Sequence, residues 1–347
     1  MTRAPRNDEL TIDQTRRDGL LRVARAAGGL SVAPLSGLAS LLGAAPAYPQ
    51  GLSNKPIRIV LAQTPGTSPD VLARTLSPRI QAHWGQSVVV ENRAGAAGAI
   101  GLEYVARSAP DGHTITIHPS STLTLPLFFP INFDVIEGFR PITIVGDNIF
   151  ALTVANNVPA RTTGEFLAWI KSQKAPVNYG SPGNGTHHHL FMEQLKLVAG
   201  VPMTHIPYKG SAQAFTDLMG GQIAAMFVPM GAAMNMAKDG HVRILAGSAK
   251  ERSPLTPDIP SIAEQGLPGF DMSAWFGALA PAGTPTEIIA RWNALFREVL
   301  AEAGTRDILG KQGIHVIANS PEDADRLIRA EYRNFVHLVK TANIKGD

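Results

Sequence analysis

The segment Lys55–Leu76 constrains the fold most strongly, because its periodicity changes abruptly at a short break. Apolar residues alternate from Ile57 to Leu61, as they do in a β-strand. The run Thr64–Pro69 then holds two prolines and a glycine, which end the strand. Ser68 suits the N-cap position of a following helix, and Pro69 suits its first turn. The segment therefore predicts a β-strand, a sharp turn and a helix.

The turn of this strand–turn–helix unit places hydroxyl groups and free backbone N–H groups at the start of a helix. Such a helix start attracts a carboxylate or a phosphate, and Asp70 adds a negative charge to the first turn. The alternative is an ordinary connection in an α/β domain that binds nothing. One turn alone leaves both interpretations open.

The same pattern recurs later in the chain. Residues 176–180 form an expected strand, Ser181–Thr186 a turn rich in Gly and Ser, and His187–Val198 a helix with one apolar face. Between the two units, a strand is predicted at His113–His118. Ser120, Ser121 and Thr122 follow its carboxyl end, and ligands of α/β sheets bind at such ends. We interpret the repeat as one anion-binding turn in each of two domains.

Strands alternate with helices along the whole chain, which predicts a doubly wound α/β architecture. Two β-type runs, Ile142–Val145 and Ile149–Val154, flank the polar residues Gly146–Asn148, as expected of a strand that crosses between two domains. Long amphipathic helices are expected from Thr286 to Ala303 and from Glu322 to Lys340, packed against the first domain.

The charge distribution argues against nucleic-acid binding. The formal net charge is +3, but six of the 31 Lys and Arg residues and four of the 28 Asp and Glu residues lie in residues 1–47, so the remainder is nearly neutral. It carries no basic stripe with interleaved aromatic residues. The absence of cysteine excludes disulfides, thiolate metal sites and a cysteine nucleophile.

Residues 1–47 are expected to be an export signal. Arg16 and Arg17 precede a weakly apolar run that ends in Ala45-Pro46-Ala47, an A-x-A type cleavage site, so we expect cleavage after Ala47. The paired arginines resemble a twin-arginine signal, although Gly19 stands where Phe is usual. An uncleaved tail is the alternative. Export predicts a periplasmic protein without direct insertion in the membrane after signal removal.

Several strings along residues 54–347 together resemble the tripartite tricarboxylate transporter receptors, the Bug-type extracytoplasmic solute-binding proteins. The strings are PGTSPDVLAR, VVVENRAGAAGAIG, APDGHTI, NYGSPGNGTHHHL, PYKGSAQAFTDLMGGQI, SAKERSPLTPDIPSIAEQGLPGF and WFGALAPAGTP.

The resemblance implies a type II periplasmic binding-protein fold, with two doubly wound α/β lobes joined by a hinge and a small carboxylate in the cleft. We expect lobe 1 to comprise residues 48–148 and 248–347, lobe 2 residues 149–247, and the hinge residues 147–149 and 246–250. The resemblance further implies delivery of the ligand to membrane transporter subunits or, in some relatives, presentation to a sensor. A monomer without cofactor, metal or enzymatic activity is expected.

The resemblance also implies where the ligand binds. The first-lobe contacts correspond to Gln63, Thr64, Gly66, Thr67, Ser68, Asp70, Ser120, Ser121 and Thr122. The second-lobe contacts correspond to Ser181, Gly183, Asn184, Gly185, Thr186, His189, Tyr208, Lys209 and Val228. Relatives tend to have glycines where this chain has Thr67-Ser68-Pro69, and often an acidic residue near Val228. The missing acid favours a carboxylate without an amine.

Two other interpretations use the same residues. His187-His188-His189 suggests a metal site, but consecutive helical residues point about 100° apart and do not readily face one ion. Ser120, His189 and Asp70 could form a hydrolase triad, although no G-x-S-x-G elbow accompanies them. Binding without catalysis or metal therefore remains the principal hypothesis.

Overall fold

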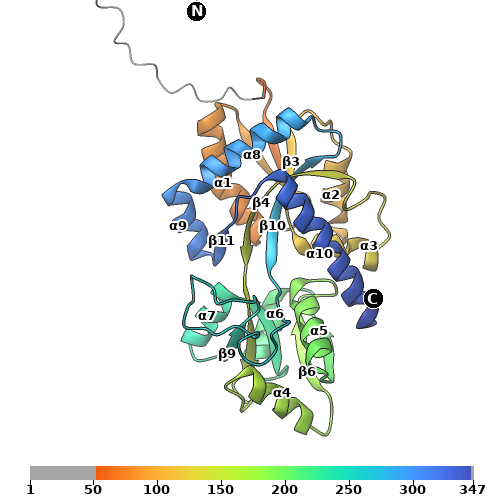
Figure 1. The fold of residues 1–347 in the computed structure, drawn as a ribbon, viewed down its shortest axis with the longest axis vertical. Helices are drawn as coiled ribbons and strands as arrows, with labels where there is room; N and C mark the ends of the chain where they lie inside the picture. Colours follow the sequence, from red (N-terminus) through yellow and green to blue (C-terminus); the bar gives the residue numbers. More distant parts are fainter. Residues whose placement is uncertain (1–51, 345–347) are drawn as a thin grey trace, which may run out of the picture. The chain divides into compact units, whose positions relative to one another are not determined.

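The computed structural model of the protein describes residues 52–344, so the expected export signal at residues 1–47 lies outside the described residues. The described residues 52–344 belong to one compact unit. Strands and helices alternate along it, which confirms the predicted α/β class (Figure 1). No helix in the described range is long and apolar enough to cross a membrane.

The described strands form two sheets. Sheet A has the order β11-β4-β10-β3-β1-β2, and sheet B the order β7-β6-β8-β5-β9. The strands are β1 Ile57–Leu61, β2 Val88–Asn92, β3 Thr114–Pro119, β4 Phe139–Asn148, β5 Phe150–Ala155, β6 Val177–Ser181, β7 Met203–Pro207, β8 Ala225–Pro229, β9 Val242–Gly247, β10 Ala274–Pro281 and β11 Ile314–Val316. We call sheet A with its helices the first lobe, and sheet B with its helices the second lobe.

Helices cover both faces of each sheet. The α-helices are α1 Ser68–Trp84, α2 Ala99–Ala106, α3 Leu125–Phe128, α4 Thr163–Ser172, α5 His187–Ala199, α6 Ser211–Met219, α7 Met230–Lys238, α8 Thr286–Ala301, α9 Ala303–Lys311 and α10 Pro321–Thr341. Two 3-10 helices, η2 Ala96–Gly98 and η3 Ser120–Thr124, complete the described elements.

In the first lobe, β1 runs parallel to β2 and β3, whereas β10 is antiparallel to β3 and β4. Helices α1, α8 and α9 lie on one face of sheet A, and α2 and α10 on the other (Figure 1). Fully buried Leu72, Trp292 and Phe296 belong to the core of the first face. Because β1 and β3 run parallel, their carboxyl ends bring Gln63 and Ser120 to the same edge of sheet A.

The second lobe repeats this arrangement on a smaller scale. Strand β6 is parallel to β7 and β8, and β5 is antiparallel to β8 and β9. Phe166 of α4 and Phe191 of α5 are buried in one core, while Leu218 of α6 and Ala233 of α7 are buried in another. The carboxyl ends of β6 and β8 therefore lie at one edge of sheet B, where the second predicted turn begins.

As predicted, one extended segment crosses from sheet A to sheet B, but the interruption lies at the single residue Ile149 and not at Gly146–Asn148. Those three residues belong to β4 because that strand has a partner on each side, so that Asn148 pairs with both Ala274 and Ile314. Sequence alone could not reveal these partners. Glycine at position 146 also allows β4 and β11 to approach closely, since a Cβ there would lie 2.4 Å from the His315 carbonyl oxygen.

The return segment, residues 249–272, contacts sheet B. The Ile262 N–H donates to the Gly247 carbonyl at 3.0 Å, and the Phe270 ring stacks on Phe227 with centroids 5.9 Å apart. Ser248 is bonded to both β5 and the end of this segment, because its Oγ accepts from the Phe150 N–H and donates to the Met272 carbonyl. The lobe boundaries remain a proposal, and these contacts favour placing residues 249–272 with the second lobe.

Candidate functional site

The turn between β1 and α1 is held together by the buried carboxylate of Asp70. Its oxygens accept hydrogen bonds from the Gly66 N–H, Arg74 Nε and Asn92 Nδ2, each at 3.0 Å. Burial raises the pKa of Asp70, but the hydrogen bonds from these three donors outweigh burial and lower the pKa below its usual value. The carboxylate is therefore ionised near neutral pH, and its oxygens accept hydrogen bonds from groups of the protein itself.

The helix that follows begins one residue earlier than predicted. Thr67, not Ser68, is the N-cap of α1, and Ser68 is its first helical residue. The Thr67 side chain donates to the Thr64 carbonyl at 2.9 Å and so does not cap the helix. No side chain caps the helix, and Asp70 instead accepts the N–H of Gly66, the residue before the N-cap, which is in the left-handed region with φ +84°.

The turn between β6 and α5 has the same geometry with different side chains. Gly185 is left-handed, with φ +73°, and donates its N–H to Nδ1 of His189, four residues later, at 3.2 Å. Thr186 is the N-cap and donates its hydroxyl to the Gly183 carbonyl, three residues earlier, at 2.8 Å. Gly66, Thr67 and Asp70 of the first turn thus correspond to Gly185, Thr186 and His189 of the second.

His189 can accept this hydrogen bond because its ring is neutral. Burial, with a smaller contribution from Lys196, lowers the pKa of His189 to about 4. The ring stacks on His205 with centroids 3.9 Å apart, and His205 Nε2 lies 2.6 Å from the Ser181 hydroxyl. Ser181 also donates to the Gly183 carbonyl, so Ser181, His205 and His189 form the internal support of the second turn.

The residues that follow β3 contact the second turn. Ser120, fully buried in η3, lies 2.7 Å from Nε2 of His187, which is the first residue of α5. The Thr124 hydroxyl reaches the Gly185 carbonyl at 3.3 Å. Thr122 instead donates to the Pro119 carbonyl within the first lobe. The first lobe therefore contacts the second turn through Ser120 and Thr124.

His187 is a residue that the sequence interpretation left out of the site. It occupies the position in α5 that Ser68 occupies in α1, which is the signal that could have identified it. Burial, followed by the neighbouring His188, lowers the pKa of His187 to about 3, so the ring is neutral when it meets Ser120.

The three consecutive histidines point to different neighbours. His187 contacts Ser120, His188 lies edge-on to the Phe150 ring with centroids 5.0 Å apart, and His189 stacks on His205. In residues 52–344, no group of three or more His, Asp or Glu side chains is placed to hold a metal ion.

The residues of the hydrolase hypothesis also have separate partners. Ser120 pairs with His187, whereas His189 accepts from Gly185 and Asp70 accepts from Arg74. The structure therefore does not assemble Ser120, His189 and Asp70 into a triad.

The remaining predicted residues lie around the two turns or behind them. Tyr208 donates its hydroxyl to Asp217 at 2.7 Å, and burial together with this bond raises the pKa of Tyr208 to about 12. Val228 is fully buried in the core between β8 and α7. Thr64, Gly66 and Lys209 are exposed, whereas Gln63, Thr67, Ser68, Ser121, Gly183, Asn184 and Thr186 are half-buried.

A cavity of about 570 Å³ adjoins the first turn, and Ser68 is the predicted site residue that lines it. Its other lining residues belong to the β4–β5 connection, the start of α7, the return segment and the α9–β11 turn. Sequence interpretation missed these residues, because elements far apart in the chain supply them.

Two α/β lobes linked by strands, each with a strand–turn–helix unit at the edge of its sheet, define a two-lobed binding protein of the type II periplasmic binding-protein fold. Solved structures agree. R. palustris Rpa4515 with adipate is 30% identical, with a TM-score of 0.75 over 84% of this chain and 99% of that chain. The periplasmic binding protein BugD is 28% identical, with a TM-score of 0.72 over 85% of this chain and 100% of that chain.

Sequence comparison identifies the family. Residues 72–344 match the tripartite tricarboxylate transporter family receptor. Protein BugT of Bordetella pertussis is 33% identical over 305 residues, which cover 87% of this chain and 94% of BugT. The chain belongs to the tripartite tricarboxylate transporter receptor family, and the predicted resemblance is confirmed.

Proposed function

We propose that the protein captures a small organic carboxylate between the β1–α1 and β6–α5 turns and delivers it to the subunits of a tripartite tricarboxylate-type membrane transporter. The observation that carries this proposal is the matched geometry of the two turns. Each has a left-handed glycine, Gly66 or Gly185, just before a helix whose N-terminus carries a partial positive charge.

The ligand class is supported by relatives of known ligand. Rpa4515 was solved with adipate, and MatC from Rhodopseudomonas palustris, 28% identical with a TM-score of 0.71, with bound malate. The internal partners of Asp70 and His189 support the same class, because they leave no free carboxylate at either turn to repel an anion.

We propose three roles for the predicted site residues. We propose that the buried residues Asp70, Ser120, Thr122, Ser181, Gly185 and His189, together with Tyr208, whose hydroxyl donates to Asp217, position the turns. Gln63, Thr64, Gly66, Thr67, Ser68, Ser121, Gly183, Asn184, Thr186 and Lys209 are proposed to contact the ligand. Val228 is proposed to act as apolar packing beneath the cleft.

The proposed mechanism is closure of two lobes on a ligand that each lobe binds. The closed state is favoured only if the ligand interacts with both turns, because a ligand shifts a conformational equilibrium by its difference in affinity between the states. The proposed hinge comprises residues 147–149 and 246–250. Ile149 connects β4 of sheet A to β5 of sheet B, and Ser248 is hydrogen-bonded to both β5 and the return segment.

A thermal-shift screen tests the proposal directly. Small carboxylates and the uncharged amides of the same skeletons would be added to the purified full-length protein. Carboxylates that bind should raise the unfolding midpoint with concentration, because a ligand that binds only the folded state stabilises it. Amides should have little effect. Equal shifts with amides, or none with any carboxylate, would refute the proposal.

A further inference from the structure

The two lobes are connected by a buried hydrogen bond as well as by the chain. The Oγ of Ser120, in η3 of the first lobe, lies 2.7 Å from Nε2 of His187, the first residue of α5 in the second lobe. Ser120 is 0% exposed and His187 is 7% exposed. Because water has little access to these groups, their hydrogen bond should be stronger than one at the surface.

Further contacts between the lobes lie beside this pair. Thr124 Oγ1, four residues after Ser120, reaches the Gly185 carbonyl at 3.3 Å, and both groups are buried. Phe128, four residues further on, faces the same turn, since a Cβ on Gly185 would lie 2.9 Å from the Phe128 ring. Residues 120–128 of the first lobe therefore pack against the β6–α5 turn of the second lobe.

The pair lies next to the proposed hinge. The His187 ring packs against Phe150, with centroids 5.8 Å apart, and Phe150 follows Ile149 directly in the chain. The Phe150 N–H donates to Ser248, which belongs to the other hinge segment. A hydrogen bond weakens steeply when its length or angle changes. Rotation of the lobes about the hinge should therefore strain or break the bond between Ser120 and His187.

This bond can bias the arrangement of the lobes because its two partners belong to different lobes. A contact that exists in one arrangement and not in another shifts the equilibrium between them by its own free energy. When the contact breaks, two buried polar groups also lose their partner, which is unfavourable until water replaces it. The bond therefore favours the arrangement in which it forms.

We propose that Ser120 and His187 are positioning residues, whose hydrogen bond stabilises the arrangement of the lobes that binds the carboxylate. The bond fixes the first residue of α5, and Thr124 fixes Gly185 in the adjoining turn, so the first lobe holds the second turn before a ligand arrives. The apparent affinity of a ligand falls when the binding arrangement is less populated. This inference rests on the proposed carboxylate-binding function.

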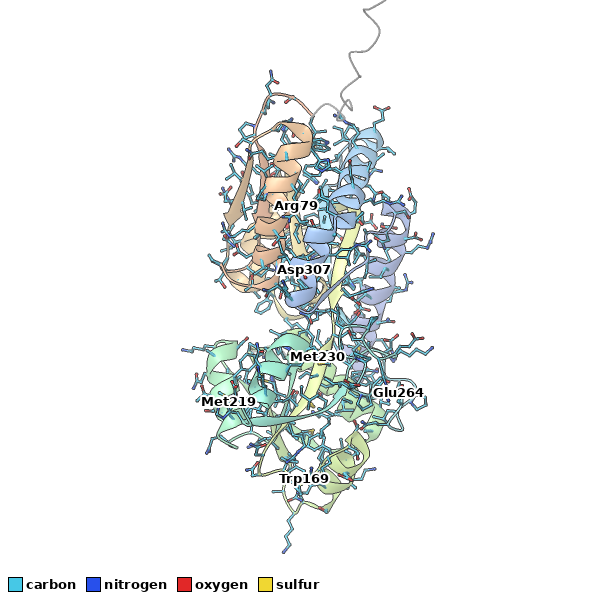
Figure 2. All side chains as sticks on the ribbon, turned by 90° about the vertical axis from the view of Figure 1, so that its left-hand side faces the viewer. Arg79, Trp169, Met219, Met230, Glu264 and Asp307 are labelled. Carbon is cyan, nitrogen blue, oxygen red and sulfur yellow. The ribbon has the colours of Figure 1, made fainter. Side chains whose placement is uncertain are left out.

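Spin labels test the inference in the full-length protein. The sequence contains no cysteine, so two introduced cysteines carry the labels alone. Asp307→Cys on α9 and Met219→Cys at the end of α6 place one label on each lobe, at exposed positions that Figure 2 labels. Double electron–electron resonance of the ligand-free protein measures the distribution of distances between the labels. The structure defines the distance for its own arrangement of the lobes.

Ser120→Ala and His187→Phe should each lower the population at that distance, relative to the remaining populations, by about fivefold, the usual effect of one buried hydrogen bond. The double variant should lower it no further, because both substitutions remove the same bond. Thr143→Val is the matched control, since the buried Thr143 hydroxyl donates to the Asn319 carbonyl at 2.9 Å within the first lobe. It should leave the distribution unchanged.

Calorimetry with adipate and malate, the acids bound to two relatives, measures the consequence for binding. An acid that binds the wild type should bind Ser120→Ala and His187→Phe more weakly, by up to about fivefold. Thr143→Val should bind it as the wild type does. A purely structural role of the pair would lower the unfolding midpoint without changing the label distances.

Three results would overturn the inference. They are unchanged distances in Ser120→Ala and His187→Phe, an equal change in Thr143→Val, and a larger population at the distance of the structure in either variant of the pair. In these cases carboxylate binding by the wild type, and with it the proposed function, would stand. The expected distances together with a carboxylate screen that yields no binder would instead contradict the proposed function, and the bond would still control the lobes.

Discussion

Asp70 and His189 perform the same task with different chemistry. Each accepts the N–H of a left-handed glycine four residues earlier, Asp70 as an ionised carboxylate and His189 as a neutral ring. Both side chains are buried, so each turn has an internal anchor at the start of its helix. Substitutions of these anchors should therefore alter stability before they alter ligand specificity.

Asp70→Asn should lower the free energy of unfolding at neutral pH by about 1–3 kcal/mol, because an amide cannot accept all the hydrogen bonds that the carboxylate accepts from Gly66, Arg74 and Asn92. Urea unfolding measures this loss. Asp258→Asn, an exposed position, is the control and should change stability by no more than about 0.5 kcal/mol. Equal stabilities of the two variants would refute the role of Asp70.

At acidic pH, the free energies of unfolding of the wild type and Asp70→Asn should become equal. The pKa of Asp70 is lower in the folded protein than its usual value of 3.8, so its contribution is complete above that value and is lost as the pH falls through the folded pKa. Unfolding curves at a series of acidic pH values measure the gap between the two proteins. A gap that stays constant into strong acid would contradict this assignment.

The sequence predicted where both turns lie but not what their side chains do. That Asp70 and His189 contact the ligand is implied by the resemblance to the receptor family. Their actual partners depend on Asn92, 22 residues beyond Asp70, and on His205 beside His189. Such long-range partners leave no periodic pattern in a sequence, which is also why the Ser120–His187 contact was missed.

The two turns should respond differently to the same glycine substitution. In Gly66→Ala the added Cβ points into open space. The variant should therefore lose only the free energy needed to hold alanine in the left-handed backbone conformation, about 1–2 kcal/mol. Gly185→Ala carries the same cost and also places the Cβ 2.9 Å from the Phe128 ring and 3.0 Å from Thr124 Oγ1, which should add about 1–3 kcal/mol. Denaturant unfolding compares the two variants, and equal losses would contradict the contact between the second turn and the α3 region.

Glu331 on α10 should make the protein less stable as the pH rises. Burial raises its pKa to about 7, with a further rise from nearby Asp271, while a hydrogen bond from Asn334 opposes them. A folded pKa above the usual 4.5 means that the contribution is complete below about pH 4.5 and is lost as the pH rises through about 7.

The free energy of unfolding of Glu331→Gln, relative to that of the wild type, should therefore rise with pH. This difference between the two proteins should be about 1–3 kcal/mol larger at pH 8 than at pH 5. Chemical unfolding at the two pH values measures the difference. Glu251→Gln, at an exposed position, should show no such dependence on pH. The same result for both variants would exclude burial of Glu331 as the cause.

Long, strongly patterned elements were predictable, and short or context-dependent ones were not. Strands β1 and β6 and helix α10 lie close to their expected bounds. Helix α9 was missed because it follows α8 almost without interruption, with Glu302 alone between them. Strand β11 has three residues and exists through pairing with β4, which sequence periodicity cannot show.

Export should depend on the paired arginines. Replacing Arg16 and Arg17 together by lysine should retain the protein in the cytoplasm if residues 1–47 act as a twin-arginine signal. Fractionation of cells that express wild type and variant measures the distribution. Unchanged periplasmic recovery of the variant would exclude that route.

The proposed function requires that the two lobes close on one carboxylate held by both turns. The most direct measurement is small-angle X-ray scattering of the full-length protein, alone and saturated with the tightest carboxylate found by calorimetry. Closure about residues 147–149 and 246–250 predicts a smaller radius of gyration in the complex. A radius of gyration that is unchanged at verified saturation would contradict it.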